Sequence, residues 1–135
     1  RLTTDVQCVT GWRVPDVEWE GVLLSHILAQ VRPNTAAAAL EFGSADGIYT
    51  ESLTLEQAQR PDVLVATHLE GEPLSNDHGG PVRLYVAPMY FYKSCKWLDR
   101  ITLTTAVIPG YWEELGYDVD AWVGRSNGRD DVPTV

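Results

Sequence analysis

The sequence predicts an α+β fold built on a mixed sheet. Segments with strand character outnumber helical segments, the helical segments are short, and neither a strand–helix–strand rhythm nor an internal repeat runs along the chain. With 135 residues, of which 44% are hydrophobic, the chain fits one domain around a single core. No apolar run approaches the roughly 20 residues that a membrane-spanning helix needs, so direct membrane insertion is not expected.

The first third of the chain predicts two strands and one helix. Residues 4–10 (TDVQCVT) alternate between polar and apolar side chains, which predicts a strand that Gly11 ends. Residues 21–32 carry apolar side chains at a helical spacing, and Pro33 marks the end of this helix. Residues 36–42 (AAAALEF) predict a strand that leads into a turn-rich loop.

The remaining predicted elements are one short helix and three strands. Thr54, followed three residues later by Gln57, is the pattern of a capping box, which predicts a helix over residues 54–60. Strands, the first of them followed by a turn, are predicted over residues 62–74, 81–87 and 101–107. The polar tail 125–135 is expected to be loose.

The chain carries a formal net charge of −9, which argues against nucleic acid or an anionic membrane as its main partner. Its few cations are unevenly placed. Four of the ten lie within 18 residues, namely Arg83, Lys93, Lys96 and Arg100. In an acidic protein such a cluster is a candidate anion site, and the alternative is a solvated face with long apolar stems.

The two cysteines are too few for a disulfide framework, although a Cys8–Cys95 bridge is possible. No Cys-x-x-Cys or His-x-x-x-His spacing indicates a zinc site. From these patterns alone, Cys8 is either a small buried hydrophobic residue or a sulfur ligand for a metal. Periodicity and composition lead no further than a soluble α+β domain.

Six segments occur in an order and spacing that match one protein family. They cover most of residues 5–117 and are CVTGW, WEGVLL, FGSADGIY, GEPLSNDHGGPVRL, YKSCKWLDRI and GYWEELGY. Together they resemble the molybdopterin-binding catalytic domain of sulfite oxidase and its bacterial relatives, including the catalytic subunit of the periplasmic methionine-sulfoxide reductase. The resemblance implies a sulfite-oxidase-type molybdopterin-binding fold over residues 1–135, with one mononuclear molybdenum–molybdopterin. Members of the family usually begin earlier, with a segment that also touches the pterin, and we expect this chain to lack it.

The resemblance gives Cys8 a role as the protein's thiolate ligand to molybdenum, beside two sulfurs of the pterin. A thiolate is a soft, electron-rich ligand that suits a redox metal, and metal binding deprotonates the thiol. The loop NDHGGPVRL resembles the family's phosphate clamp, so His78 and Arg83 are expected to contact the cofactor. Arginine offers phosphate a rigid fork of donors, and glycines let the backbone approach a ligand closely. The alternative is a plain hairpin turn with a surface arginine.

The segment YKSCKW supplies the other cofactor contacts that the resemblance implies. Lys96 would face the anionic pterin as a point charge, while Ser94 and Cys95 would contribute mostly through their backbone. Cys95 is therefore not expected to bind the metal. Ser44 matches a position where members of the family contact the pterin through a small hydroxyl residue. Trp97 is expected in the core, and the other tryptophans in the core or the pocket wall.

Two residues bear on the substrate by the same resemblance. Tyr49 falls where sulfite oxidases keep a tyrosine beside the molybdenum, and its phenol could donate a hydrogen bond or relay a proton. Arg13 lies five residues after Cys8, where sulfite oxidases carry an arginine that faces the oxyanion and where the methionine-sulfoxide branch departs. The alternatives are a half-buried strand tyrosine and a surface arginine that ends a strand.

The resemblance implies a two-electron oxygen-atom transfer, with electrons passed to a separate haem or cytochrome partner because the chain has no haem-attachment motif. Arg13 and Tyr49 favour sulfite or a similar small oxyanion as the substrate, and reduction of an S- or N-oxide is the second choice. A cofactor-free binding or scaffold module is the alternative from another class. The resemblance also favours a periplasmic or otherwise extracytoplasmic location.

Overall fold

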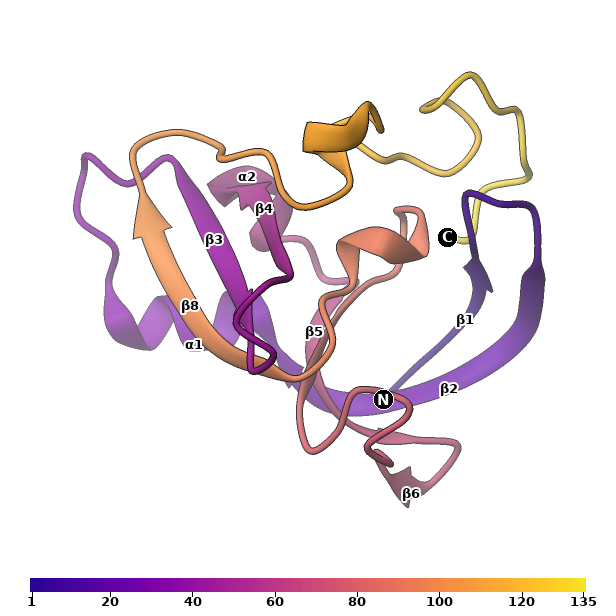
Figure 1. Ribbon diagram of the computed structural model, residues 1–135. Coiled ribbons are helices and arrows are strands. Elements are labelled where there is room, and N and C mark those ends of the chain that lie inside the picture. Colours follow the sequence, from indigo (N-terminus) through magenta and orange to yellow (C-terminus); the bar gives the residue numbers. More distant parts are fainter.

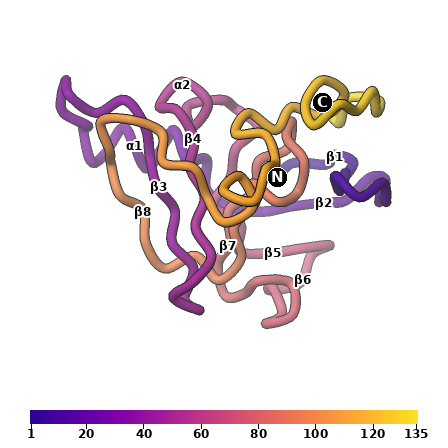
Figure 2. Tube along the Cα trace, turned by 45° about the horizontal axis from the view of Figure 1, so that its top comes forward, coloured from indigo at the N-terminus to yellow at the C-terminus, as the bar shows by residue number.

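The computed structural model describes residues 1–135 and consists of two sheets (Figure 1). The larger sheet has the strand order β1-β2-β5-β6, and β7 also pairs with β5. Its strands are β1 (Leu2–Gln7), β2 (Arg13–Leu23), β5 (Val63–Leu69), β6 (Glu72–Pro73) and β7 (Arg83–Val86). The smaller sheet, with the order β4-β3-β8, contains β3 (Ala39–Ser44), β4 (Thr50–Thr54) and β8 (Leu98–Thr104). Figure 2 shows that the strands of the two sheets run in different directions.

The helical segments are short. They are α1 (Leu24–Val31), α2 (Leu55–Ala58) and the 3-10 turns η1 (Phe91–Lys93) and η2 (Glu113–Leu115). None of the helices has the length and apolar character that crossing a bilayer requires. The predicted capping box is confirmed, because the Gln57 N–H donates to Thr54 Oγ1 and the Thr54 N–H donates to Gln57 Oε1, both at 3.0 Å.

Every strand pair is antiparallel, so the prediction of a mixed sheet is wrong. Antiparallel partners can be joined by turns and irregular loops, whereas parallel partners need a long crossover that is usually helical. The two short α-helices supply no such crossover within either sheet. Strands dominate the structure, and the α+β class therefore describes it only loosely.

The sequence patterns do not predict β2 and β4. β2 contains Pro15, which is typical of an edge position, yet β2 pairs with β1 along one part and with β5 along another. Because β2 extends to Leu23, α1 begins three residues later than the helical spacing predicts. β1 ends at Gln7, so Cys8 lies in the turn after the strand.

Two clusters of buried apolar side chains form the core. The larger contains 14 residues, drawn from both α-helices, the smaller sheet, β5, β7 and nearby loops. The smaller contains 8 residues, and in it Trp19 of β2 stacks on Tyr85 of β7 with 4.3 Å between ring centroids. Burial of one large apolar side chain contributes about 1.5–3 kcal/mol. The loops that follow these strands are therefore anchored to a well-packed core.

The tail 125–135 contains no helix or strand, but hydrogen bonds tie it to the rest of the chain. The Tyr90 hydroxyl donates to Asp131 Oδ2 at 2.6 Å, and Thr134 Oγ1 donates to the Ala87 carbonyl at 2.5 Å. The expectation of a loose tail therefore does not describe this structure.

A buried ion cluster, which we call the carboxylate–lysine triad, joins three segments. The ammonium of Lys93 lies 2.9 Å from Glu51 Oε1 and 2.9 Å from Glu113 Oε1, and the three side chains are at most 1% exposed. Burial and the neighbouring Glu113 carboxyl raise the pKa of Glu51 to about 9. The Glu51 carboxyl is therefore protonated at neutral pH. Removal of one partner from a buried ion pair costs about 3–5 kcal/mol.

The proton held by Glu51 predicts a pH-dependent stability. Between about pH 5 and pH 9 the folded protein keeps a proton that the unfolded chain has lost, so the free energy of unfolding falls as the pH rises. One such group contributes up to about 1.4 kcal/mol per pH unit. We expect Glu51→Gln, a neutral isostere of the protonated carboxyl, to remove this slope in denaturant unfolding measured across that range.

Glu114→Gln is the matched control, because Glu114 is an exposed carboxylate next to the triad in sequence. It should leave the slope unchanged. Equal slopes for the wild type and Glu51→Gln would mean that Glu51 is ionised in the folded protein at neutral pH.

Candidate functional site

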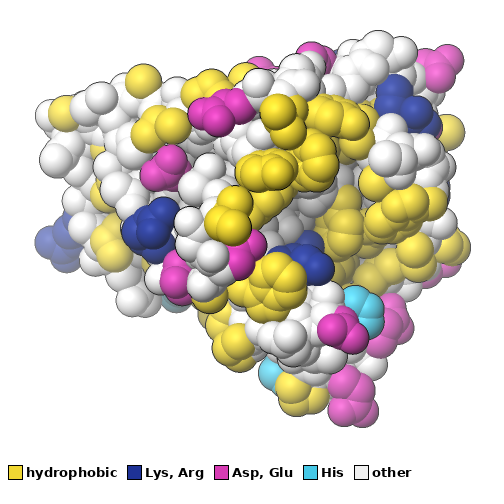
Figure 3. All heavy atoms as spheres, viewed as in Figure 1, with side chains coloured by type: hydrophobic (Ala, Val, Ile, Leu, Met, Phe, Trp, Pro, Cys, Tyr) yellow, Lys and Arg dark blue, Asp and Glu magenta, His cyan; other side chains and the backbone are white.

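A pocket of about 420 Å³ opens among the loops that follow β1, β3 and β6 and the segments around η1 and η2. The space-filling view shows a hollow ringed by hydrophobic side chains, with a basic group inside it (Figure 3). Seven of the nine predicted site residues line the pocket: Cys8, Ser44, Tyr49, His78, Arg83, Ser94 and Lys96. The other two, Arg13 and Cys95, are not among the lining residues.

Cys8 brings a free thiol to the pocket from the turn between β1 and β2. The Cys8 N–H donates to the Trp12 carbonyl at 2.9 Å, and the Gly11 N–H donates to the Cys8 carbonyl at 3.1 Å. Gly11 has a φ of 115°, a conformation that favours glycine. The Thr10 hydroxyl lies 3.0 Å from Cys8 Sγ and holds the sulfur in place.

The structure contains no group of three or more His, Cys, Asp or Glu side chains that could hold a metal ion. A metal bound at Cys8 would therefore take most of its ligands from something other than the protein. A cofactor that carries its own sulfur ligands meets this requirement, since soft sulfur ligands suit a redox metal.

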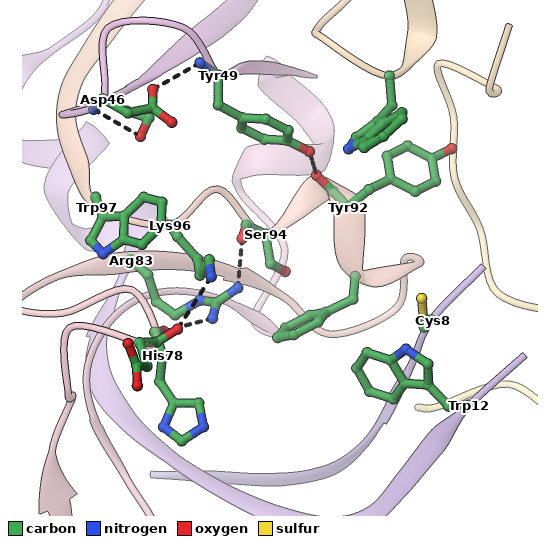
Figure 4. Close-up of a pocket in the computed structure, with 14 residues that line it drawn as sticks. Cys8, Trp12, Asp46, Tyr49, His78, Arg83, Tyr92, Ser94, Lys96 and Trp97 are labelled. Atoms are coloured by element: carbon green, nitrogen blue, oxygen red, sulfur yellow. Dashed lines mark hydrogen bonds between the residues drawn. The ribbon is translucent and has the colours of Figure 1, made fainter. Parts of the chain in front are cut away.

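Arg83 places a buried cation in the pocket wall at the start of β7. Its guanidinium donates to the carbonyls of His78 and Ser94, each at 2.7 Å (Figure 4). The guanidinium also lies 4.5 Å from the centroid of the Phe91 ring. Burial lowers the pKa of Arg83 to about 10. No carboxylate pairs with Arg83, so its buried charge favours the binding of an anion beside it.

Lys96 is the second cation of the pocket, and it also lacks a carboxylate partner. Its ammonium donates to the Asp77 carbonyl at 3.2 Å and lies 4.5 Å from the centroid of the Trp97 ring. Gly79 makes room for this side chain, because a Cβ on Gly79 would lie 2.7 Å from Lys96 Cγ. This glycine therefore serves close packing within the protein.

The four clustered cations of the sequence have three different surroundings. Arg83 and Lys96 line the pocket, Lys93 is buried in the triad, and Arg100 is exposed on β8. The cluster is therefore neither a single anion site nor a single solvated face. Only two of its members can meet a ligand in the pocket.

The two expected serines engage their hydroxyls within the protein. Ser94 Oγ accepts from the Val86 N–H at 2.9 Å, and Ser44 Oγ accepts from the Asp46 N–H at 3.3 Å. Asp46, which the sequence reasoning missed, also lines the pocket. Its carboxylate accepts from two backbone N–H groups of the following turn, and these hydrogen bonds lower its pKa.

His78 lies at the pocket, whereas Cys95 lies in the core. The ring Nδ1 of His78, an exposed residue, is 3.1 Å from Ser75 Oγ. Cys95 is fully buried, and its thiol donates to the Lys96 carbonyl at 3.6 Å. Burial raises the pKa of Cys95 to about 12, so this thiol is poorly suited to metal binding. Both cysteines are free, and the possible Cys8–Cys95 bridge is not formed.

Tyr49 lines the pocket, and its hydroxyl donates to the Tyr92 carbonyl (Figure 4). Burial raises the pKa of Tyr49, so its phenol keeps its proton at neutral pH. Because that proton is engaged by a backbone carbonyl, this hydrogen bond must be released before Tyr49 can donate to a substrate.

Arg13 is held outside the pocket. Its Nε forms an ion pair with Asp5 Oδ2 at 2.7 Å, and its other nitrogens donate to the carbonyls of Val132 and Pro133 at 2.7 and 3.2 Å. Arg13 thus fastens the tail to the first two strands. The sequence could not indicate this arrangement, since the two carbonyls lie more than a hundred residues away.

Aromatic side chains form much of the pocket wall, including Trp12 and Trp112, which were expected in the core or the pocket wall, and Phe91 and Tyr92, which were given no role. Trp97 also lines the pocket and is only half-buried, so its predicted place in the core is wrong. All of these rings except Trp112 lie within four residues of a predicted site residue, which is a usable signal. No such signal marks Trp112.

The family model described as the oxidoreductase molybdopterin binding domain matches residues 1–112. The chain belongs to this family. It is 36% identical over 120 residues to the uncharacterized oxidoreductase YuiH of Bacillus subtilis, in a match that covers 87% of this chain and 60% of that protein. It is 34% identical to the sulfite oxidase of Arabidopsis thaliana, with coverages of 79% and 32%. It is 30% identical to the protein-methionine-sulfoxide reductase catalytic subunit MsrP of Gluconobacter oxydans, with coverages of 95% and 46%.

Among solved structures, the sulfane dehydrogenase SoxCD from Paracoccus pantotrophus is similar with a TM-score of 0.71 at 23% identity. The match covers 79% of this chain and 32% of that chain, and it supports the fold. The resemblance of the sequence to the sulfite oxidase and methionine-sulfoxide reductase family is thereby confirmed. The chain spans 60%, 32% and 46% of the three curated relatives named above.

The residues of the pocket fit the molybdopterin cofactor of the family. Cys8 offers one free thiol, which is enough for a metal that arrives with sulfur ligands of its own. Arg83 and Lys96 offer two cations without carboxylate partners, which suit a phosphate. All three residues line the same pocket, so a single ligand can contact all of them.

Lys96→Ala tests the expected phosphate contact. Loss of a charge-assisted hydrogen bond costs about 1.5–3 kcal/mol, which corresponds to about ten- to a hundredfold weaker cofactor binding. The half-buried Lys96 side chain makes one hydrogen bond, to a backbone carbonyl, so the variant should fold normally. We expect protein purified from a molybdopterin-producing host to be depleted in molybdenum and pterin, as measured by elemental analysis and pterin fluorescence.

Arg100→Ala is the matched control, because it removes one exposed cation of the same cluster that does not line the pocket. Its cofactor content should equal that of the wild type. Full cofactor content in Lys96→Ala would show that the phosphate binds elsewhere.

Proposed function

We propose that this chain binds one mononuclear molybdenum–molybdopterin and catalyses a two-electron oxygen-atom transfer on a small sulfur compound. The observation that carries the proposal is one pocket that presents both a free thiol, Cys8, and two cations without carboxylate partners, Arg83 and Lys96 (Figure 4). Membership in the molybdopterin-binding oxidoreductase family supports it.

When bound, the cofactor supplies two-electron redox chemistry at the metal. Cys8 would provide the sulfur ligand from the protein. Arg83 and Lys96 would bind the phosphate, with His78 and the backbone of Ser94 and Cys95 beside them. These residues hold the cofactor in one orientation and supply no redox chemistry themselves.

The aromatic residues of the pocket would contact the substrate. Tyr49 keeps its phenolic proton and would donate a hydrogen bond to the substrate oxygen once it releases the Tyr92 carbonyl. Reduction of an S-oxide consumes two electrons and two protons and yields a thioether and water. The reaction therefore needs both a proton donor and a source of electrons.

A neutral S-oxide, or a similar N-oxide, is the substrate class that the pocket suits best. The expectation of sulfite rests on Arg13 and Tyr49, and of these Arg13 is committed to Asp5 and the tail carbonyls outside the pocket. The lining that contains Cys8 includes Trp12 and Trp112, whose faces suit a thioether or sulfoxide group.

Sulfite oxidation is the second candidate. The 34% identity to a plant sulfite oxidase and the position of Tyr49 in the pocket favour it. In that case the oxyanion would depend on Arg83 and Lys96 for its charge compensation, in competition with the cofactor phosphate.

Two further parts of the proposal come from the family resemblance. One is a separate haem or cytochrome partner that exchanges electrons with the cofactor. The other is a periplasmic or otherwise extracytoplasmic location. Both follow the relatives that the sequence resembles.

Cofactor loading separates this proposal from a cofactor-free scaffold module. Protein made in a molybdopterin-producing host should contain molybdenum in proportion to protein, and Cys8→Ser should lose oxidoreductase activity while keeping pterin. Cys95→Ala is the matched control and should keep its metal, because only backbone contacts are expected there. Wild-type protein without molybdenum or pterin would support the scaffold alternative.

Steady-state kinetics of Arg13→Met decides between the two substrate classes. With a neutral S-oxide, we expect kcat/KM to change by no more than about twofold, because Arg13 lies outside the pocket. A sulfite KM raised about tenfold or more, together with strong sulfite turnover by the wild type, would instead make sulfite the substrate. Both substrates should be assayed side by side with both proteins.

A further inference from the structure

Each member of the carboxylate–lysine triad lies within two residues of an aromatic side chain that lines the pocket. The pairs are Glu51 with Tyr49, Lys93 with Tyr92, and Glu113 with Trp112. The triad therefore joins the three segments that carry these rings. We propose that the triad positions Tyr49, Tyr92 and Trp112, which we call the three-ring wall, and so determines how a substrate fits against it.

The three segments also meet through uncharged contacts, among them the hydrogen bond that the Tyr92 hydroxyl donates to the Asp118 carbonyl at 2.6 Å. The Tyr49 hydroxyl donates to the Tyr92 carbonyl, and the Tyr111 N–H donates to the Thr50 carbonyl at 3.2 Å. The Tyr49 and Tyr111 rings are 5.9 Å apart between centroids. No ion pair outside the triad involves these segments. The triad is thus the charged contact that holds them in register.

Lys93 also reaches beyond the two carboxyls, because its ammonium donates to the Val119 carbonyl at 2.9 Å. It thereby holds both η2 and the backbone that follows η2. A Cβ on Gly110 would lie 3.0 Å from both Glu51 Oε1 and Glu113 Oε2, so the chain just before η2 closes over the carboxyls. The whole segment 110–119 is fastened to the triad.

The side chains that surround the triad are uncharged at neutral pH. The titratable groups that face it are Tyr49, Tyr92 and Cys95, and burial raises the pKa of each, so all three are neutral at neutral pH. If the segment 110–119 moved away, it would remove Glu113 from Lys93 deep in the protein. Such a separation of buried charges is strongly unfavourable, and the segment therefore keeps one position.

An ionic contact is not required for stability at this place, since well-packed apolar side chains stabilise a core equally well or better. An ionic contact of this kind is directional, because each hydrogen bond from the ammonium constrains both the distance and the angle to its partner. This property suits the positioning of rings whose faces meet a substrate.

Glu113→Leu tests the proposal. It removes the tether of η2, and it also removes the carboxyl that helps to raise the pKa of Glu51, so Glu51 can ionise and pair with Lys93 and no buried charge is left without a partner. We expect amide hydrogen exchange over residues 110–119 to become about tenfold faster or more, while exchange in α1 stays as in the wild type. Acrylamide should also quench Trp112 more strongly, as measured by difference against Trp112→Phe in each background.

The second part of the test follows the substrate, and this part alone rests on the proposed function. With cofactor content unchanged, the KM of Glu113→Leu for the substrate should rise about tenfold while kcat changes much less, because the wall binds the substrate and does not bind the metal. If the wild type shows no molybdenum or turnover, the proposed function fails, and the exchange measurement still decides the positioning role.

Leu28→Ala is the matched control for general destabilisation. Leu28 is buried in α1 and belongs to none of the three segments, so its loss should not accelerate exchange selectively over residues 110–119. If Glu113→Leu does not fold, Glu113→Gln replaces it, since glutamine keeps the shape and loses the charge. Two results would overturn the proposal. One is a folded variant whose amide hydrogens over residues 110–119 exchange as slowly as in the wild type, and the other is a variant whose exchange accelerates as much in α1 as over residues 110–119.

Discussion

The guanidinium of Arg83 connects two loops that form one wall of the pocket. It donates to the His78 carbonyl before β7 and to the Ser94 carbonyl after η1. Hydrogen bonds from a charged donor are roughly twice as strong as neutral ones, and burial protects them from water. The same group is a cation without a carboxylate partner, so one side chain both shapes the loops and attracts the ligand between them. Arg83 therefore has a structural role and a role in the site at the same time. Lys96 contributes a charge and has little structural role.

The pocket contains two cations without carboxylate partners, Arg83 and Lys96, beside the carboxylates of Asp46 and Asp77, inside a protein whose formal net charge is −9. The acidic surface repels small anions over most of its area, and the cations Arg83 and Lys96 favour them at one place. The aromatic residues of the same cavity present no charge. A ligand with an anionic end and a less polar end would therefore be bound in one orientation.

Local patterns explain which features were predictable from the sequence. The capping box of Thr54 and Gln57 depends on residues three apart, and its prediction was correct. The contacts of Arg13 depend on Asp5 and on tail carbonyls more than a hundred residues away, so no local pattern indicates them. The antiparallel pairing of every strand and the half-buried position of Trp97 are likewise set by tertiary contacts. The family resemblance brought together seven residues of one pocket, although neither charge nor periodicity could do so.

The pocket draws its walls from Cys8 near one end of the chain and from Trp112 near the other. Contacts between such distant positions form slowly, because closing a long loop costs chain entropy before any contact compensates for it. The cavity therefore exists only after most of the chain has reached its native arrangement. A ligand that binds only this completed form then shifts the folding equilibrium toward it by mass action. Newly made protein in a cell short of the ligand would consequently be the form most open to proteolysis.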